Sequence, residues 1–184
     1  MPKLRIEPGA CLLPVLGIVF LPARWLLGVI LAASVHELSH AAAAVALGCG
    51  VREVTLGFRG ARMVLGPATR SQEVLCAAAG PVGSLLLLSL IRRFPEAALA
   101  GFVQGCFNLL PIYGLDGGRI LGGLVGERVY GIIQNGFPVA VAGGLIWGIC
   151  TGKGGWMLFP LGLVLLNSIQ ERKSSCKESN PAVQ

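Results

Sequence analysis

Residues 34–40 read Ser-Val-His-Glu-Leu-Ser-His and lie inside a long apolar run, Trp25 to Leu47. His36 and His40 are the only two histidines of the chain. On a helix, residues four apart lie one turn apart on the same face, so both imidazoles can reach a single zinc ion. Glu37 follows the first histidine, where a carboxylate can take a proton from a water that the metal activates. The spacing therefore predicts a metal site with two histidine ligands and Glu37 as the general base.

The alternative interpretation is an ordinary helix whose two histidines happen to be four residues apart. The surroundings favour the metal site, because after Arg24 and as far as Leu47 the three motif residues are the only ionisable side chains. A charge at the centre of a membrane helix costs about 2.5–3.5 kcal/mol on insertion scales, so ionisable groups there are typical of a functional site.

The composition indicates a membrane protein. Of the 184 residues, 54% are hydrophobic and 13% are charged, and the mean hydropathy is +0.73. Soluble domains carry about 25% charged residues. The chain is long enough for about six spans of about 20 residues. We therefore expect an all-α polytopic membrane protein with about six transmembrane helices, a small β-hairpin after the second, and the lipid bilayer as its surroundings.

The apolar runs are separated by turn residues and by charges. The spans are expected at residues 10–21, 25–47, 71–91, 96–110, 129–150 and 154–169. Gly48-Cys49-Gly50 should end the second span, and Gly80-Pro81 should break the third. Pairs of small residues such as Gly101/Gly105 suit close helix packing in lipid. We expect residues 1–173 to form one domain and residues 174–184 to form a polar cytoplasmic tail.

Val51 to Arg70 differs from the spans, because apolar and polar residues alternate loosely and Gly66-Pro67 ends the pattern. This predicts a β-hairpin directly after the helix that carries the histidines. An exposed strand edge there can pair with an extended substrate segment. The alternative is a hairpin that merely covers the membrane surface.

The positive charges predict the orientation. If the N-terminus is cytoplasmic, four of the fifteen basic residues lie outside (Arg24, Arg92, Arg93 and Lys153) and the others lie inside. Positive charge concentrates on the cytoplasmic side, so both termini of this multi-pass protein of the cell membrane should be cytoplasmic. The net charge of +6 is explained by this topology, and we expect no nucleic acid as partner, since the basic residues form no patch interleaved with aromatics.

Met1 to Gly9 lacks a convincing cleavage site and is expected to be retained. The six cysteines form no CxxC pair and are expected to be small buried apolar residues rather than disulfides.

A third zinc ligand is needed, because a catalytic zinc usually has three protein ligands and an open position. No third histidine exists, which leaves a carboxylate. Asp116 is the only aspartate, and it follows a stretch, Asn108 to Gly118, whose proline and glycines should unwind the backbone before a short helix resumes at Ile120 to Val125. By the predicted topology it lies on the side of His40. An aspartate that supports its own turn is the alternative reading, and the competing ligands are Glu53, Glu73, Glu96 and Glu127, of which Glu96 is on the other side.

The two motifs, HELSH at residues 36–40 and NLLPIYGLDGG at residues 108–118, resemble the paired HExxH and NxxPxxxxDG motifs of the site-2 protease (M50) family of intramembrane zinc metalloproteases. Within that family the six-span layout and Ala79-Gly80-Pro81 look most like stage IV sporulation protein FB. The resemblance implies a Zn²⁺ held by His36, His40 and Asp116, with Glu37 as the base. It also implies that Asn108 is a catalytic residue that holds the substrate or the oxyanion.

The resemblance further implies a membrane protein substrate that is cut within or near a transmembrane segment, in regulated intramembrane proteolysis. It implies regulatory membrane proteins as further partners. The likeness to the sporulation protein also implies a role in sporulation. Two features depart from the pattern. Ser39 stands where the family commonly has glycine, and we expect little effect from this. Few residues follow the expected sixth span in this sequence, and we therefore expect neither a nucleotide-sensing regulatory domain nor a PDZ domain there.

Two other classes of function remain open. One is a non-enzymatic membrane protein, either a proteolytically inactive relative or a metal transporter. The other is a different HExxH membrane protease with a glutamate as third ligand. Asp116→Asn separates these, because it should cripple the site predicted here and spare the glutamate-dependent one.

Overall fold

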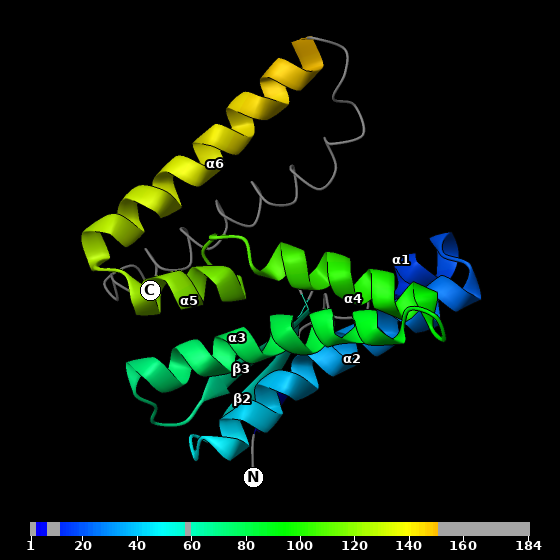
Figure 1. Ribbon diagram of the computed structural model, residues 1–184, viewed down its shortest axis with the longest axis horizontal. Helices are drawn as coiled ribbons and strands as arrows, with labels where there is room; N and C mark the ends of the chain where they lie inside the picture. Colours follow the sequence, from blue (N-terminus) through cyan, green and yellow to red (C-terminus); the bar gives the residue numbers. More distant parts are fainter. Residues whose placement is uncertain (1–2, 7–11, 58–59, 151–184) are drawn as a thin grey trace. The chain divides into compact units, whose positions relative to one another are not determined.

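The computed structural model describes residues 3–6, 12–57 and 60–150. They form a mostly helical fold with one small sheet (Figure 1). The chain divides into two compact units, Met1–Leu109 and Leu110–Gln184, which are described in turn. In chain order the elements are β1 (Lys3–Ile6), α1 (Leu12–Phe20), α2 (Ala23–Ala46), β2 (Val51–Gly57), β3 (Gly60–Leu65), α3 (Arg70–Leu86), the 3₁₀ helix η2 (Leu87–Leu90), α4 (Pro95–Asn108), α5 (Asp116–Leu124) and α6 (Glu127–Cys150).

Helix α2 carries both histidines and ends where the sequence predicts. Pro22 precedes it with φ −56° and ψ 145°, an extended conformation that suits the residue before a helix. After Leu47, Gly48 and Gly50 have positive φ of 73° and 64°, and their N–H groups bond to carbonyls of the last turn. Glycine adopts these angles without a Cβ penalty, so the pair stops the helix and turns the chain into β2.

Helix α3 begins with a capping box that also holds the end of α2. The Gln72 side chain accepts a hydrogen bond from the Thr69 N–H at 2.8 Å, while the Thr69 hydroxyl caps the first turn. The same Gln72 amide donates through Nε2 to the Leu47 carbonyl at 3.0 Å. One side chain therefore connects the start of α3 to the end of α2.

The predicted break at Gly80-Pro81 is wrong, because α3 continues through Pro81 to Leu86 and then narrows into η2. A proline inside a helix removes one backbone hydrogen bond. Membrane proteins tolerate this where neighbouring helices surround the freed carbonyl. Pro81 is buried between the helices packed around it, so packing outweighs the local propensity.

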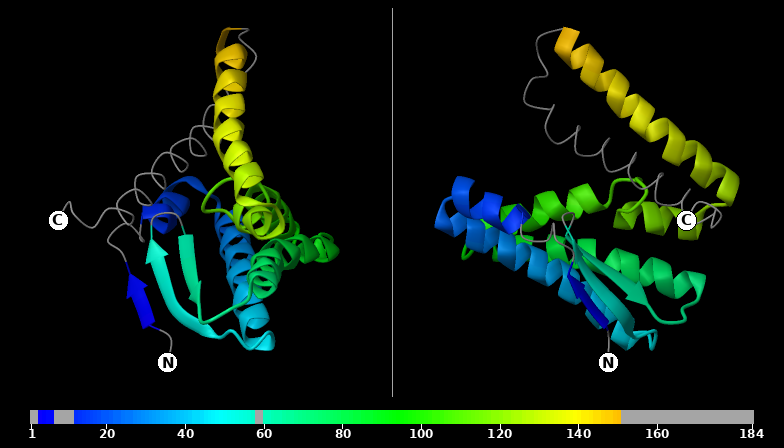
Figure 2. Two further views of the ribbon diagram at one scale, coloured as in Figure 1. Left: turned by 90° about the vertical axis from the view of Figure 1, so that its left-hand side faces the viewer. Right: turned by 180° about the vertical axis from the view of Figure 1, so that it is seen from behind.

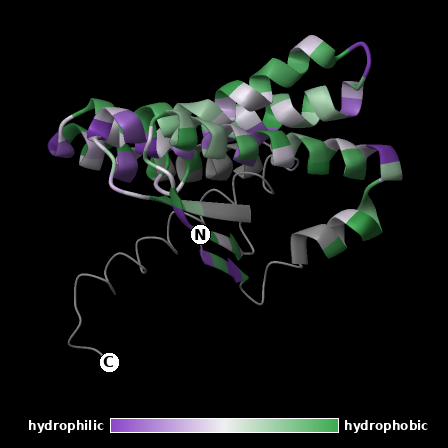
Figure 3. Cartoon of the chain, turned by 90° about the horizontal axis from the view of Figure 1, so that it is seen from below, coloured by the Kyte–Doolittle hydropathy of each residue, from purple (hydrophilic) through white to green (hydrophobic). Residues whose placement is uncertain are grey.

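Helices α2, α3 and α4 pack against one another through small residues. The buried positions of α2 repeat every four residues and are Gly28, Ala32, His36, His40 and Ala44. Its other faces expose large aliphatic side chains such as Leu27, Leu38 and Val45, and apolar residues cover most of the helices (Figure 3). Small residues inside and large aliphatic residues outside are the pattern expected of helices that pack in lipid.

Helix α4 approaches the other two helices at glycines. A Cβ on Gly28 of α2 would lie 2.9 Å from the Ala97 nitrogen, and one on Gly101 would lie 2.8 Å from the Ser84 carbonyl oxygen. A Cβ on Gly105 would lie 3.3 Å from the Pro81 oxygen. The predicted Gly101/Gly105 pair is thus a close-packing surface against α3.

The predicted hairpin is confirmed, with β2 and β3 antiparallel and a bulge between Val51 and Glu53. The sequence analysis missed β1, which pairs in parallel with β2 so that Lys3 lies opposite Glu53. The strand order is β1-β2-β3, and the three strands lie side by side (Figure 2). A strand of four residues with a partner so distant in sequence leaves no local signal.

Among the described residues, two helices are long and apolar enough to cross a membrane, Ala23–Ala46 and Arg70–Leu90. Helices α1 and α4 have 9 and 14 residues. The predicted sixth span, residues 154–169, and the predicted tail, residues 174–184, lie outside the described residues. Six spans and a single domain over residues 1–173 therefore stay predictions.

In the second unit the predicted unwinding before Asp116 is confirmed. Gly114 has φ 90°, and Ile112 is buried in the loop. Helix α5 starts at Asp116, earlier than the predicted Ile120. A carboxylate in the first turn is favourable at the positive end of the helix dipole, and a Cβ on Gly118 would overlap the Ile112 carbonyl oxygen, so the loop can fold back closely only on glycine.

Three cysteines of the described chain are free thiols, Cys49 and Cys76 buried and Cys106 exposed. The expectation of small buried residues is confirmed for Cys49 and Cys76 and is wrong for Cys106, which lies on an exposed face of α4.

Ser39 and Gly83 meet where α2 crosses α3. A Cβ on Gly83 would overlap Ser39 Oγ and would lie 2.8 Å from Ser39 Cβ. The Ser39 hydroxyl donates to the Val35 carbonyl at 2.7 Å, which satisfies it within its own helix. Serine is therefore accommodated at position 39 because position 83 has no side chain.

We expect Gly83→Ala to lower the thermal stability of the detergent-solubilised protein, and Ser39→Gly to remove most of that effect in the double variant. Neighbouring residues that clash show coupling of about 0.5–3 kcal/mol. The measurement is a double-mutant cycle by thermal unfolding. Gly131→Ala is the matched control, because a Cβ at Gly131 meets nothing within 4 Å and its effect should add to that of Ser39→Gly. Strict additivity of Gly83→Ala and Ser39→Gly would contradict the contact.

Candidate metal centre

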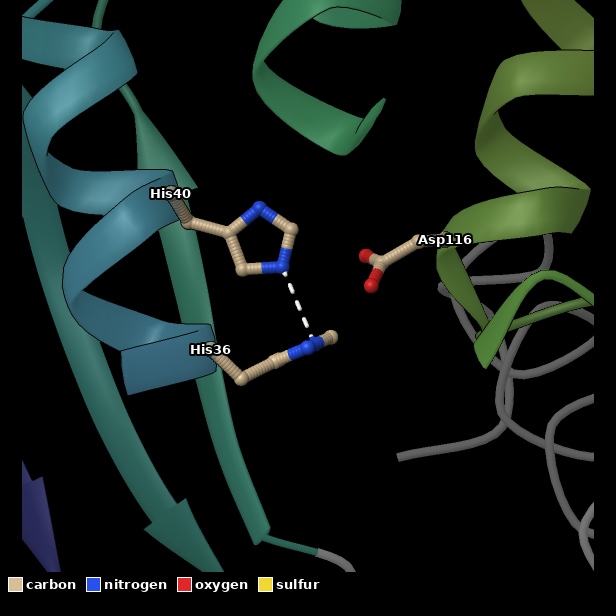
Figure 4. A group of neighbouring side chains, drawn as sticks. All are labelled: His36, His40 and Asp116. Carbon is tan, nitrogen blue, oxygen red and sulfur yellow. Dashed lines mark hydrogen bonds between the residues drawn. The ribbon is translucent and has the colours of Figure 1, made fainter. Parts of the chain in front are cut away.

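His36 and His40 lie together on the buried stripe of α2, with exposed fractions of 3% and 9%. Their Nε2 atoms are 3.3 Å apart (Figure 4), and the rings are nearly perpendicular at 87°. Two nitrogens bound to one zinc at 2.0–2.1 Å in a tetrahedral arrangement lie about 3.3–3.4 Å apart. The separation of the two Nε2 atoms is therefore consistent with zinc.

The other nitrogen of His40 fixes its tautomer. Nδ1 lies 2.7 Å from the Cys76 carbonyl oxygen of α3. A carbonyl oxygen only accepts, so Nδ1 carries the hydrogen and Nε2 of the neutral ring presents its lone pair. Ligating histidines are typically oriented by such an outer hydrogen bond.

The outer contact of His36 also comes from α3. Its Nδ1 lies 2.8 Å from Ser84 Oγ. With Nδ1 as donor, Nε2 of His36 also presents a lone pair. Two lone pairs 3.3 Å apart repel each other in a buried setting, and a shared cation converts that repulsion into attraction. The donor set and its orientation thus fit a divalent metal.

Helix α3 shapes the space around both rings. Cys76, Gly80 and Ser84 are buried at intervals of four residues, and so form one stripe that faces α2. A Cβ on Gly80 would overlap the His40 imidazole. The sequence analysis assigned no site residue to α3. The available signal was the small and polar residues at a helical interval, but a backbone carbonyl has no signature in the sequence.

Glu37 and Asn108 belong to the same unit as the histidines. Glu37 follows His36 on α2 and is half-buried. Asn108 is the last residue of α4, and its Nδ2 donates to the Gln104 carbonyl of its own helix at 3.1 Å. Amide side chains commonly bond to nearby backbone in this way at helix ends. The predicted contact of Asn108 with substrate or oxyanion stays a prediction.

Asp116 is the first residue of α5 in the second unit and is 7% exposed. Buried carboxylates are rare unless paired or bound to a metal. Of the competing glutamates, Glu73 and Glu127 are exposed, whereas Glu53 and Glu96 are half-buried. The structure brings His36 and His40 together, and the assignment of Asp116 as their third partner is treated below as a proposal.

We expect Gly80→Ala to abolish high-affinity zinc binding, because the added methyl group takes space that the His40 ring occupies. Zinc content of the detergent-purified protein measures this, and Gly136→Ala, with open space around its position, is the matched control. A folded Gly80→Ala protein with native zinc content would contradict the packing of α3 on His40.

Comparison with known proteins finds relatives in sequence and in fold. The chain is 30% identical over 178 residues to the protein named "Putative zinc metalloprotease Rip3" of Mycobacterium tuberculosis, in the Erdman and H37Rv strains. The match covers 73% of this chain and 45% of the relative, so the chain spans about half the length of the curated relatives it matches. The fold is similar to that of the solved site-2 protease from Methanocaldococcus jannaschii, with a TM-score of 0.63 and 20% identity over 91% of this chain and 89% of the other.

The narrower resemblance to stage IV sporulation protein FB stays a prediction.

A model of the peptidase M50B-like family matches residues 10–109. This region covers more than half of the chain and includes α2, α3 and α4, which together hold both histidines and their outer contacts. The chain therefore belongs to the peptidase M50B-like family.

Proposed function

We propose that this protein is an intramembrane zinc metalloprotease that hydrolyses a peptide bond within or near a transmembrane segment of a membrane protein. The observation that carries the proposal is the histidine pair. Two Nε2 atoms are held 3.3 Å apart by a helix that is long and apolar enough to cross a membrane. Membership of a peptidase family and the names of the matched proteins support the same reading.

Asp116 is proposed as the third ligand. His36, His40 and Asp116 are all buried, and each offers one ligand atom of a kind that divalent metals accept. Two imidazoles and one carboxylate are a donor set of catalytic zinc sites, in which a fourth position stays open. Figure 4 draws the three side chains of this proposal.

A zinc ion held by these residues would supply a Lewis acid that polarises the scissile carbonyl and acidifies a water molecule. The role proposed for Glu37 is to accept the proton of the attacking water and pass it to the leaving amine. Asn108 is proposed to release the Gln104 carbonyl and donate its amide hydrogen to the developing oxyanion. Donors of that kind contribute about 2.7–4 kcal/mol in other hydrolases.

The proposed topology has both termini in the cytoplasm. Strand β1 precedes α1 and α2, and β2 follows them, yet the two strands are paired. The N-terminal strand and the hairpin therefore lie on one side of any bilayer that α2 crosses. The sheet carries Lys3, Arg5, Arg52 and Arg62, which favours the cytoplasmic side.

The proposed substrate is a membrane protein segment that unwinds before cleavage, because a helix engages its own carbonyls. Within the described chain β2 is paired on both edges, and β3 has β2 on one edge. Both β1 and β3 therefore have an outer edge, and the outer edge of β3 is the proposed place for an extended substrate segment, by strand addition. Regulation by other membrane proteins and a role in sporulation are expectations from the family resemblance alone.

Glu37→Gln should keep zinc but lower the cleavage rate by about 10²–10⁴, since the amide cannot accept the proton. The probe is a single-span fusion protein with a Gly-Pro pair at the cytoplasmic end of its membrane segment, cut in detergent micelles. Glu73→Gln, which changes an exposed glutamate of α3, is the matched control. Retained turnover in the Glu37→Gln protein would rule out this base.

Asp116→Asn should lower zinc content well below the native level, which we expect to be about one ion per chain for a three-ligand site. Metal analysis of the purified proteins measures this, with Glu127→Gln as a control at an exposed carboxylate in the first turn of α6. Native zinc content in the Asp116→Asn protein would point to a different third ligand. A folded native protein that binds no zinc would favour a proteolytically inactive relative.

A further inference from the structure

We propose that Ser84 is a positioning residue that orients His36 as an Nε2 ligand by accepting its Nδ1 hydrogen. This inference rests on the proposed metal site and deepens it. It concerns only residues of the first unit and does not depend on which carboxylate completes the site.

The contact is direct and buried. Ser84 Oγ lies 2.8 Å from His36 Nδ1, across the interface of α2 and α3. Ser84 is fully buried and His36 is 3% exposed. A buried hydroxyl or imidazole N–H left without a partner costs about 1–3 kcal/mol, so this contact satisfies a polar group on each helix.

Two other serines, Ser39 on α2 and Ser89 on η2, show what is unusual about Ser84. Ser39 Oγ donates to the Val35 carbonyl at 2.7 Å, and Ser89 Oγ donates to the Leu86 carbonyl at 2.7 Å. Both bond within their own helical turns, which is the common choice for serine in a helix. The Ser84 hydroxyl instead reaches a side chain on another helix.

A hydroxyl suits His36 better than a second carbonyl would. If the two Nε2 atoms, 3.3 Å apart, share a hydrogen bond when no metal is bound, His40 is its acceptor, because the Cys76 carbonyl fixes the hydrogen of His40 on Nδ1. The donor is then His36 Nε2, which leaves its Nδ1 to accept from Ser84. With metal bound, Nδ1 of His36 donates to Ser84 instead. A serine hydroxyl can do both, so the contact between Ser84 and His36 persists in either tautomer of His36.

Helix α4 holds Ser84 in place from its other side. A Cβ on Gly101 would lie 2.8 Å from the Ser84 carbonyl oxygen, and one on Gly105 would lie 3.3 Å from Ser84 Cβ. Alanine keeps the Cβ that packs there and removes only the hydroxyl. Ser84→Ala is therefore a clean test of the hydrogen bond.

The first experiment measures zinc affinity of the full-length chain in detergent by competition with a chelator. Ser84→Ala should bind zinc about 10–100-fold more weakly, the loss typical of an outer hydrogen bond to a ligating histidine. Ser89→Ala, an exposed serine that bonds its own helix, should bind as the native protein does. Thermal unfolding of the metal-free proteins reports the fold separately. A purely structural role would lower the unfolding temperature and leave the affinity unchanged.

A second measurement reports the protonation of the two imidazole rings directly. Because the chain has two histidines, ¹⁵N-histidine labelling gives a simple spectrum in the zinc-loaded native protein. Both rings should carry hydrogen on Nδ1 and metal on Nε2, and the Nδ1 signal of His36 should move in the Ser84→Ala protein. An unprotonated Nδ1 on His36, or unchanged zinc affinity in Ser84→Ala, would overturn this inference while the proposed protease stands. A native protein without zinc would overturn both.

Discussion

The structure depends on the hydrogen bonds that α3 supplies to two buried imidazoles on α2. Histidine rings inside an apolar helix interface are costly unless their ring nitrogens have partners. The Cys76 carbonyl and the Ser84 hydroxyl provide these contacts from one stripe of α3. The requirement that both contacts form at once fixes the register of α3 against α2, because a shift of one residue would turn the stripe away.

Close approach of the helices follows from that requirement. Gly80 leaves room for the His40 ring, and Gly83 leaves room for Ser39. Gly101 and Gly105 let α4 press on the opposite side of α3. In lipid, where apolar surfaces gain little from meeting each other, such small residues allow the van der Waals contact that holds helices together. The glycines are thus part of the support of the site, although none carries a functional group.

Short local patterns in the sequence were sufficient to predict some elements of the fold and of the site. The four-residue spacing of His36 and His40 and the glycines that end α2 are properties of a few adjacent residues, and both were predicted. Three features were not: β1, the continuous α3 through Pro81, and the contacts of Ser84. Each depends on a partner distant in sequence, which a local pattern cannot specify. The early start of α5 at Asp116 was missed for a different reason, since it depends on how closely the loop at Ile112 folds back on Gly118, six residues later.

The parallel pairing of β1 with β2 has a consequence for how the protein is made. Strand β1 is synthesised first, but its partner follows only after α1 and α2. Chains emerge from the ribosome in order, and a pairing between distant segments must wait for both. The hairpin of β2 and β3 can form as soon as it emerges. Strand β1, which precedes α1 and α2 in the sequence, then pairs with β2. The three-stranded sheet can therefore be completed only after the helix that carries the histidines has been synthesised.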